Sequence, residues 1–186
     1  MKKLWIISVS AIMAISLTAC GAGDVDASSS KGLLPQTSSQ TASSQSSSSQ
    51  AASFPIRVKE SSVSDDFAGL QKYLAGNASV TGTPEEMRKD MIGAKSGVRY
   101  KYGYNGKDNV MLELYEFDLS NLNATAQKVI SEVKSSGKFT MIDQPVNAIL
   151  SKNGKYLMVY KNTSTDDANK AYDAQVKKLF TDFKAE

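Results

Sequence analysis

The 186-residue sequence contains no histidine, a single cysteine and a single tryptophan. Without an imidazole, the chain has no Ser-His-Asp or Cys-His nucleophilic site, no histidine proton shuttle and none of the usual histidine-bearing zinc sites. A lone cysteine excludes a disulfide framework. The 22 basic and 19 acidic side chains leave a formal net charge of +3, which is too small and too evenly spread to indicate nucleic-acid binding.

Several site motifs are also missing. Neither of the phosphate-binding patterns GxGxxG and GxxxxGK[ST] occurs, and no acidic residues have the spacing of an EF-hand calcium loop. We therefore expect no cofactor and no metal. With 41% apolar residues, the length suits one modest globular domain.

The amino-terminal residues have the features of an export signal. Lys2 and Lys3 precede an apolar run over residues 4–17, which is too short to span a bilayer comfortably. The run ends in the sequence Leu-Thr-Ala-Cys-Gly at residues 17–21. We expect residues 1–19 to be a signal peptide that ends directly before Cys20.

The sequence around Cys20 resembles the lipobox of bacterial lipoproteins, in which a hydrophobic residue and two small residues precede the cysteine. The resemblance implies that a diacylglyceryl group with palmitate-type chains is attached to Cys20, which becomes the mature amino terminus. It also implies a lipid-anchored protein on the extracytoplasmic face of the cell membrane. A thiolate is nucleophilic enough for this alkylation, and two acyl chains suffice for stable anchoring. A plain secretory signal with an incidental cysteine, or a short membrane anchor, is the alternative.

Residues 20–53 are expected to be a flexible tether behind the lipidated cysteine. Serine, glutamine, alanine and threonine dominate residues 27–53, so this stretch cannot bury enough apolar surface to offset the entropy lost on folding. A coil of this length has a root-mean-square span of about 30 Å. Long serine-rich tethers of this kind resemble those of Gram-positive lipoproteins.

The third region, residues 54–186, is expected to fold as an α+β domain that starts with two helices. Apolar residues at helical spacing after Ser62 predict the first helix: Val63, Phe67, Leu70 and Leu74. A capping box with proline at the first helical position starts at Thr83 and predicts a second, short helix that ends near Gly93. Later apolar stripes predict a helix closed by Gly137 and a last helix that opens at Thr165.

Two β-hairpins are predicted between these helices. In the first, a five-residue loop over residues 105–109 is favoured over a two-residue Asn105-Gly106 turn, which would set the cations Arg99 and Lys101 opposite aliphatic residues. The favoured register pairs Tyr104 with Val110, Tyr102 with Leu112, Tyr100 with Leu114, and Lys101 with Glu113.

In the second hairpin, the turn Lys152-Asn153-Gly154-Lys155 predicts that Leu150 pairs with Leu157 and Ile149 with Met158, and the pairing is expected to continue to Ala148 with Val159 and Asn147 with Tyr160.

These elements predict a four-stranded antiparallel sheet, built from two hairpins, with helices packed on one face and two additional amino-terminal helices. The arrangement is similar to uncharacterised domains of small clostridial-type lipoproteins. That resemblance implies no particular activity.

The other sheet face is the candidate binding surface. Tyrosine combines apolar area with a polar tip and methionine adapts its shape, so together they suit recognition of a cell-wall component, a peptide or an envelope protein. The candidate residues are Met111, Tyr115, Phe117, Tyr156, Met158, Tyr160, Arg99 and Lys101. The alternative is that the two leading helices cover this face with Phe67, Leu70, Leu74, Met87 and Met91.

The sequence favours a non-enzymatic binding module, and no catalytic residue is assigned. A small cell-wall hydrolase or transglycosylase that uses Glu113 or Glu116 is the alternative from a different class. Such chemistry needs two carboxyl groups about 5 to 10 Å apart in one substrate cleft.

Overall fold

The computed structural model describes residues 55–185. The expected signal peptide, the lipobox cysteine Cys20 and the tether lie outside the described residues. None of the helices within residues 55–185 is both long and apolar enough to cross a membrane.

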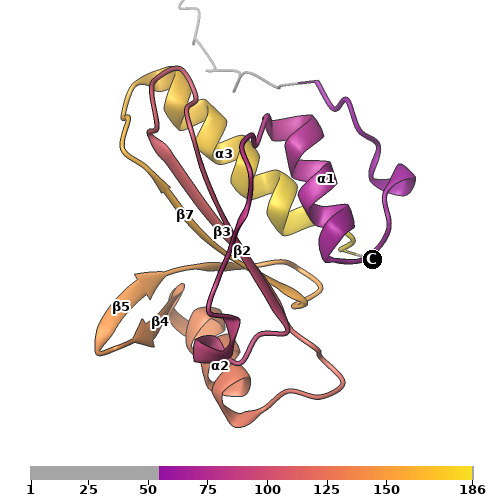
Figure 1. Cartoon of the computed structure of the whole chain (residues 1–186), viewed down its shortest axis with the longest axis vertical. Coiled ribbons are helices and arrows are strands. Elements are labelled where there is room, and N and C mark those ends of the chain that lie inside the picture. The colour runs from indigo at the N-terminus through magenta and orange to yellow at the C-terminus, as the bar shows by residue number, and fades with distance from the viewer. Residues whose placement is uncertain (1–54, 186) are drawn as a thin grey trace, which may run out of the picture. The chain divides into compact units, whose positions relative to one another are not determined.

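The described residues form an α+β fold around a five-stranded antiparallel sheet (Figure 1). Across this sheet the strand order is β1 (Glu85–Glu86), β2 (Ser96–Tyr102), β3 (Val110–Glu116), β7 (Tyr156–Asn162) and β6 (Ile149–Leu150). A separate two-stranded sheet pairs β4 (Lys138–Met141) with β5 (Gln144–Asn147). The α+β class is therefore confirmed, with five strands in the main sheet in place of four.

Helices lie on both faces of the main sheet, so the prediction that they share one face is wrong. Helices α1 (Phe67–Ala78) and α3 (Asp167–Asp182) pack against each other and cover one face. Helix α2 (Ala124–Ser136) packs on the opposite face. We call these the α1/α3 face and the α2 face.

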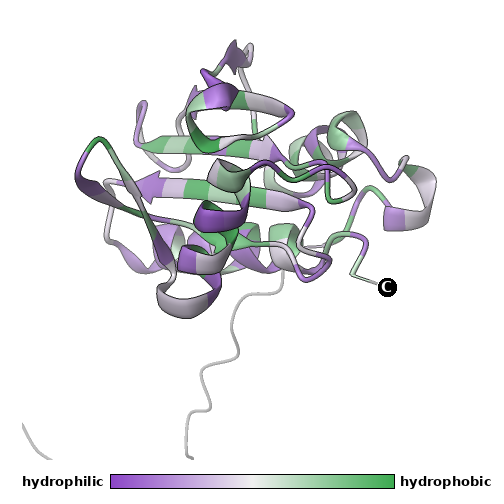
Figure 2. Ribbon diagram, turned by 90° about the horizontal axis from the view of Figure 1, so that it is seen from below, coloured by the Kyte–Doolittle hydropathy of each residue, from purple (hydrophilic) through white to green (hydrophobic). Residues whose placement is uncertain are grey.

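The alternation of side chains along β3 explains why two cores form. Successive strand residues point to opposite faces. Leu112 and Leu114 belong to the core under α1 and α3, whereas Tyr115 belongs to the core under α2. Figure 2 shows hydrophobic stretches running along the central strands. Because both faces of β3 are covered, apolar residues occupy even as well as odd positions of its sequence Val-Met-Leu-Glu-Leu-Tyr-Glu.

Each long helix begins at a side-chain cap. Asp66, Asn123 and Asp166 each accept a hydrogen bond from the backbone N–H three residues further on, at 2.7, 2.9 and 3.0 Å. The backbone and side-chain hydrogen bonds that Asp66 and Asp166 accept lower the pKa of both carboxyl groups. The last predicted helix is confirmed as α3, and Gly137 closes α2 in the left-handed conformation as expected.

The second predicted amino-terminal helix does not form. Glu85 and Glu86 pair with β2 as strand β1, and Met87 N–H donates to the Gly97 carbonyl at 3.0 Å. Only a short 3₁₀ helix, η2 (Lys89–Ile92), follows, and a second one, η1 (Glu60–Ser62), precedes α1. The segment makes its backbone hydrogen bonds with the edge of β2 instead of forming the first turn of a helix. Such tertiary contacts override local helix signals.

The register of the first hairpin differs from the favoured one by two residues. Tyr102 pairs with Val110 and Arg99 with Glu113, so Lys101 faces Met111. The reason lies in Asn109, whose amide accepts from Tyr104 N–H at 2.9 Å and donates to the Tyr104 carbonyl at 3.1 Å. This side chain replaces a strand partner for Tyr104 and ends the ladder early. The two-residue Asn105-Gly106 turn does not form either.

The second hairpin confirms its predicted register at its two central pairs. Ile149 pairs with Met158 and Leu150 with Leu157. Gly154 takes a positive φ of 73° in the connecting turn, a conformation that glycine adopts without steric cost. The predicted continuation to Asn147 and Tyr160 is wrong, because Asn147 pairs with Lys138 in the small sheet.

Candidate functional site

The eight residues of the candidate binding surface lie on two different faces. Tyr115 pairs with Leu157 between β3 and β7, so the face that carries Tyr115 continues through Leu157 and Val159. Met111, Tyr115 and Phe117 therefore belong to the α2 face, with Arg99 and Lys101. Tyr156, Met158 and Tyr160 belong to the α1/α3 face. A single surface containing all eight is wrong, because the β3–β7 register places the odd residues of β3 beside the odd residues of β7.

Helices cover most of these aromatic side chains. Tyr156 and Met158 are fully buried, and Tyr115 is 2% exposed. Phe67 of α1 stacks on Tyr156 with ring centroids 6.5 Å apart. The alternative that the leading helix covers the surface is thus confirmed for α1, which adds Leu70 and Leu74 to the same core.

One end of the α2 face remains accessible. Residues opposite each other on neighbouring strands point to the same face. Lys101 of β2, Met111 of β3 and Lys161 of β7 are direct partners across three strands. Both lysines are exposed and the methionine is partly buried. We call these three residues the cationic row. With strands about 4.8 Å apart, the two lysine Cα atoms are about 10 Å apart on either side of Met111.

The next row on this face holds an ion pair between a half-buried arginine and a buried glutamate. Arg99, Glu113 and Val159 are direct partners, and Glu113 is only 5% exposed. Arg99 donates to Glu113 Oε1 from Nη2 at 2.6 Å and from Nε at 2.9 Å. Tyr115 Oη donates to Glu113 Oε2 at 2.9 Å. Both carboxylate oxygens therefore have partners supplied by the protein.

Gly97 positions the tyrosine of this arrangement. It is the β2 partner of Tyr115, and a Cβ at Gly97 would lie 2.8 Å from Tyr115 Cδ1. The ring thus lies closely over the glycine, as aromatic side chains do across a strand glycine. Burial raises the pKa of Tyr115, and the neighbouring Glu113 carboxylate raises it further. The hydroxyl stays protonated and acts as a donor to Glu113.

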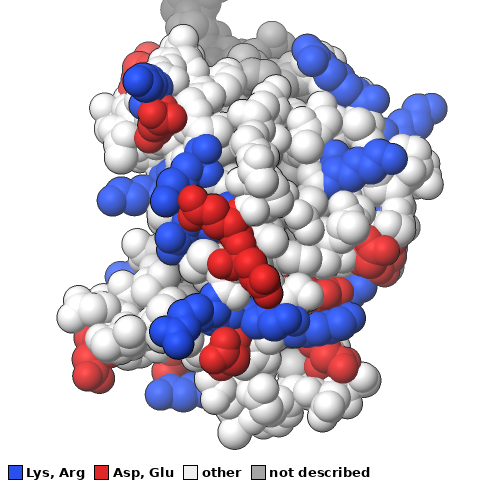
Figure 3. Space-filling view, in the orientation of Figure 1, with Lys and Arg blue, Asp and Glu red and all other residues white. Residues whose placement is uncertain are grey.

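The two lysines of the cationic row differ in their partners. Lys101 Nζ lies 3.5 Å from Glu85 Oε2, in a pair whose side chains are both 58% exposed. Such an exposed pair contributes little and leaves the ammonium group available. Lys161 has no ion-pair partner among the described residues. Basic and acidic side chains are interspersed on the face of the molecule seen in Figure 3.

The carboxylates Glu113 and Glu116 do not converge. They are three residues apart on one strand and therefore point to opposite faces. Glu116 pairs with Lys95 at 3.7 Å and lies opposite Tyr156 in the ladder. Within residues 55–185, no three acidic, histidine or cysteine side chains are placed to hold a metal ion.

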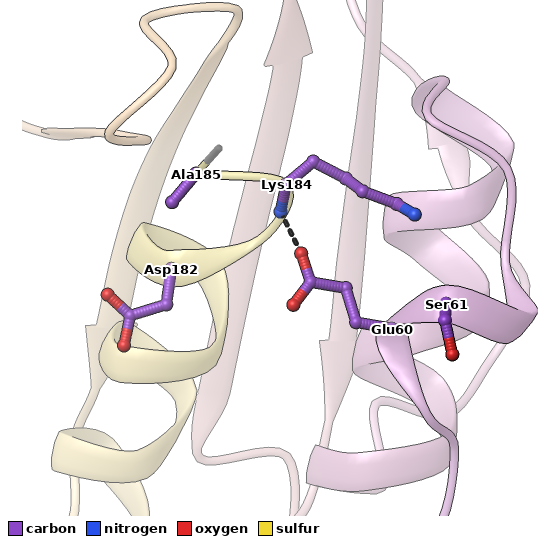
Figure 4. Close-up of a pocket in the computed structure, with 5 residues that line it drawn as sticks. All are labelled: Glu60, Ser61, Asp182, Lys184 and Ala185. Carbon is purple, nitrogen blue, oxygen red and sulfur yellow. Dashed lines mark hydrogen bonds between the residues drawn. The ribbon is translucent and has the colours of Figure 1, made fainter.

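A shallow hollow lies between η1 and the end of α3 (Figure 4). Its lining includes Glu60, Asp182 and Lys184, and the Glu60 carboxylate accepts a hydrogen bond from the Lys184 backbone N–H. Asp182 points away from Glu60 and bonds Lys152 at 2.7 Å, and its hydrogen bonds to Lys152 and Lys178 lower its pKa. These groups are used within the fold, so the hollow offers no converging set of free polar atoms.

Sequence reasoning did not single out Lys161, nor a buried amide cluster near the same strand ends. Asn109 Nδ2 donates to Asn162 Oδ1 at 2.9 Å and to Asn169 Oδ1 at 3.0 Å, which joins the residue directly before β3 to β7 and α3. No local pattern marks these residues, because the β3–β7 register brings them together across more than 50 residues of chain. The network leaves its amides satisfied by one another, which indicates a structural role.

No protein family, curated protein or solved structure matches the chain.

Proposed function

We propose that the chain is a lipid-anchored extracytoplasmic lipoprotein whose α+β domain is a non-enzymatic binding module for an envelope protein. The signal-like amino terminus, the lipobox at Cys20 and the serine-rich tether support the anchor. The cationic row supports the binding role. The choice of an envelope protein as the partner rests on this row of residues.

The chemistry of the cationic row favours an extended acidic segment. Two ammonium groups attract carboxylates, and Met111 between them offers an adaptable apolar contact. In an extended chain, every second side chain points to the same side, at intervals of about 7 Å. A sequence with acidic, apolar and acidic residues at alternate positions places its carboxylates about 13 Å apart, within reach of the two long lysine side chains. A polymer that carries only anionic groups would make no apolar contact with Met111.

A hydrolase or transglycosylase acting through Glu113 or Glu116 has no comparable support. The two carboxylates lie on opposite faces of the sheet, and both oxygens of Glu113 already accept hydrogen bonds. Two carboxyl groups that act on one glycosidic bond must face the same cleft.

The anchor is tested by intact-mass analysis of the protein purified from the membrane fraction. We expect a chain that begins at Cys20 and carries a thioether-linked diacylglyceryl group. The Cys20→Ser variant has no nucleophilic sulfur, so it should keep its leader and lack the lipid. An unmodified Cys20 in the mature wild-type protein would contradict the anchor and leave the binding role untouched.

The binding role is tested by fluorescence anisotropy with the full chain and a labelled peptide that contains Glu-Ser-Leu-Ser-Glu. The double variant Lys101→Ala, Lys161→Ala should weaken binding about tenfold, because each exposed charge pair contributes up to about 1 kcal/mol. Lys72 on α1 is exposed and makes no ion pair with any other residue of the described range, so Lys72→Ala is the matched control and should leave affinity unchanged. Affinity should fall with added salt. Equal weakening by Lys72→Ala would refute the assignment to the cationic row.

Peptide controls separate the apolar from the ionic contribution. Replacing the leucine of the probe by serine should weaken binding, because Met111 loses its contact. A probe with lysine in place of glutamate should not bind. If the serine probe binds as well as the leucine probe, the partner is recognised by charge alone, and the choice of a protein segment over a purely anionic polymer is wrong.

A further inference from the structure

The sequence contains the dipeptide Asn-Gly twice, at residues 105–106 and 153–154, and the two copies lie in very different surroundings. This dipeptide is chemically labile, because glycine has no side chain to hinder attack of its backbone nitrogen on the preceding asparagine amide. The structure distinguishes the two copies although their local sequences do not.

At residues 153–154 both reacting groups are engaged. Asn153 Oδ1 accepts from Ser151 Oγ at 2.6 Å and from Lys155 N–H at 3.0 Å. Its Nδ2 donates to the Lys184 carbonyl at 2.9 Å. The nucleophile is held as well, since Gly154 N–H donates to the Ser151 carbonyl at 2.9 Å. Attack at this site requires several of these hydrogen bonds to break first.

At residues 105–106 neither group is held. Asn105 and Gly106 are both exposed, in the loop between β2 and β3. The Asn105 side chain and the Gly106 N–H make no hydrogen bond within residues 55–185. Asn105 also has a positive φ of 45°, a conformation that costs a non-glycine residue some energy and that opening of the loop relieves.

We propose that Asn105 is a site of spontaneous deamidation and that Asn153 is protected from it by the fold. After the Gly106 amide loses its proton to solvent, its nitrogen attacks Asn105 Cγ. A carbon–nitrogen bond forms, and the side-chain nitrogen leaves as ammonia. Water then opens the resulting succinimide at either carbonyl and gives aspartate or isoaspartate. The product carries one more negative charge in the loop that joins the strands of Lys101 and Met111.

The test is peptide mapping by mass spectrometry after incubation of the full chain at mildly alkaline pH. Native protein should lose the Asn105 amide at least about tenfold faster than the Asn153 amide, since releasing Asn153 requires several hydrogen bonds to break. In concentrated urea the two rates should become similar, because the fold no longer protects Asn153. Similar rates in the native protein, or faster loss at Asn153, would overturn the proposal.

A matched variant confirms the chemistry. A Cβ at Gly106 would lie 3.3 Å from Asn109 Oδ1, so Gly106→Ala requires only a small adjustment of the loop. This variant should slow deamidation at Asn105 in the native chain and in urea, and leave Asn153 unchanged. A slow loss of the Asn105 amide in the native protein, together with a fast loss in urea, would show that the folded loop protects this site. That result would also overturn the proposal.

Discussion

The two faces of the central sheet are built from the same strands, but the helices cover them to different extents. On the α1/α3 face, two helices cover a core rich in tyrosine and phenylalanine, including Tyr156, Tyr172 and Phe183. On the α2 face, one helix covers Tyr115 and Phe117, and beyond them lie the Arg99–Glu113 pair and the cationic row. Strand β3 thus supplies the α1/α3 core through its even residues. Its odd residues Glu113 and Tyr115 are buried on the α2 face, and Met111 lies at the open end of that face.

The largest expected difference between the faces is in stability. Leu112 is fully buried on the α1/α3 face, so Leu112→Ala should cost about 2 to 5 kcal/mol of unfolding free energy. Its neighbour Met111 faces the other side and is only partly buried, so Met111→Ala should cost about 1 kcal/mol. Urea denaturation of the full chain measures both. Equal losses of unfolding free energy in the two variants would mean that Leu112 and Met111 are packed equally tightly on their two faces.

A smaller effect is expected where the α2 face buries charge. Glu113→Ala leaves Tyr115 Oη and the half-buried Arg99 without their acceptor and should cost about 2 to 3 kcal/mol. Glu113→Gln keeps one oxygen acceptor and should cost less. The double variant Arg99→Ala, Glu113→Ala tests the coupling, because removing both partners should be milder than the sum of the single changes. Additive losses would show that the ion pair acts as two independent residues.

The helices on the two faces should respond differently to acid, because their capping residues differ in charge. Asp66 and Asp166 cap α1 and α3, whereas the neutral Asn123 caps α2. The folded-state pKa of both aspartates lies below the ordinary value of 3.8, so the unfolded state binds protons more readily in this range. Their contribution to stability is present above about pH 3.8 and is lost as the pH falls through the folded-state pKa.

Hydrogen exchange at low pH measures this difference. The amides of α1 and α3 should lose protection before those of α2. Asn caps a helix about as well as Asp, so the double variant Asp66→Asn, Asp166→Asn should keep the caps and reduce the acid sensitivity. If α2 loses protection first, or the variant is equally sensitive, the caps are not the origin of the acid response.

Local signals in the sequence predicted much of the fold. The Asn153-Gly154 turn fixed the pairing of Leu150 with Leu157, and the aspartate at the start of α3 and Gly137 marked helix ends. The first hairpin failed because the Asn109 side chain, rather than the apolar pattern, ends the ladder. The short helix expected after Thr83 failed because an edge of β2 was available for pairing.

The candidate site was predicted only in part. Arg99, Lys101, Met111 and Tyr115 share one face as expected, since alternation along β2 and β3 fixes their sides. The register between β3 and β7 depends on strands separated by about 40 residues, and no turn connects them directly. That register excluded Tyr156 and Tyr160 from the face and brought in Lys161.

The most direct test of the account is an NMR titration of the isotope-labelled full chain with the Glu-Ser-Leu-Ser-Glu peptide. We predict saturable chemical-shift changes at the amides of Lys101, Met111 and Lys161, with the α1 and α3 amides unaffected. Changes centred on α1 and α3, or no saturable change at the cationic row, would contradict the claim that the open end of the α2 face is the binding surface.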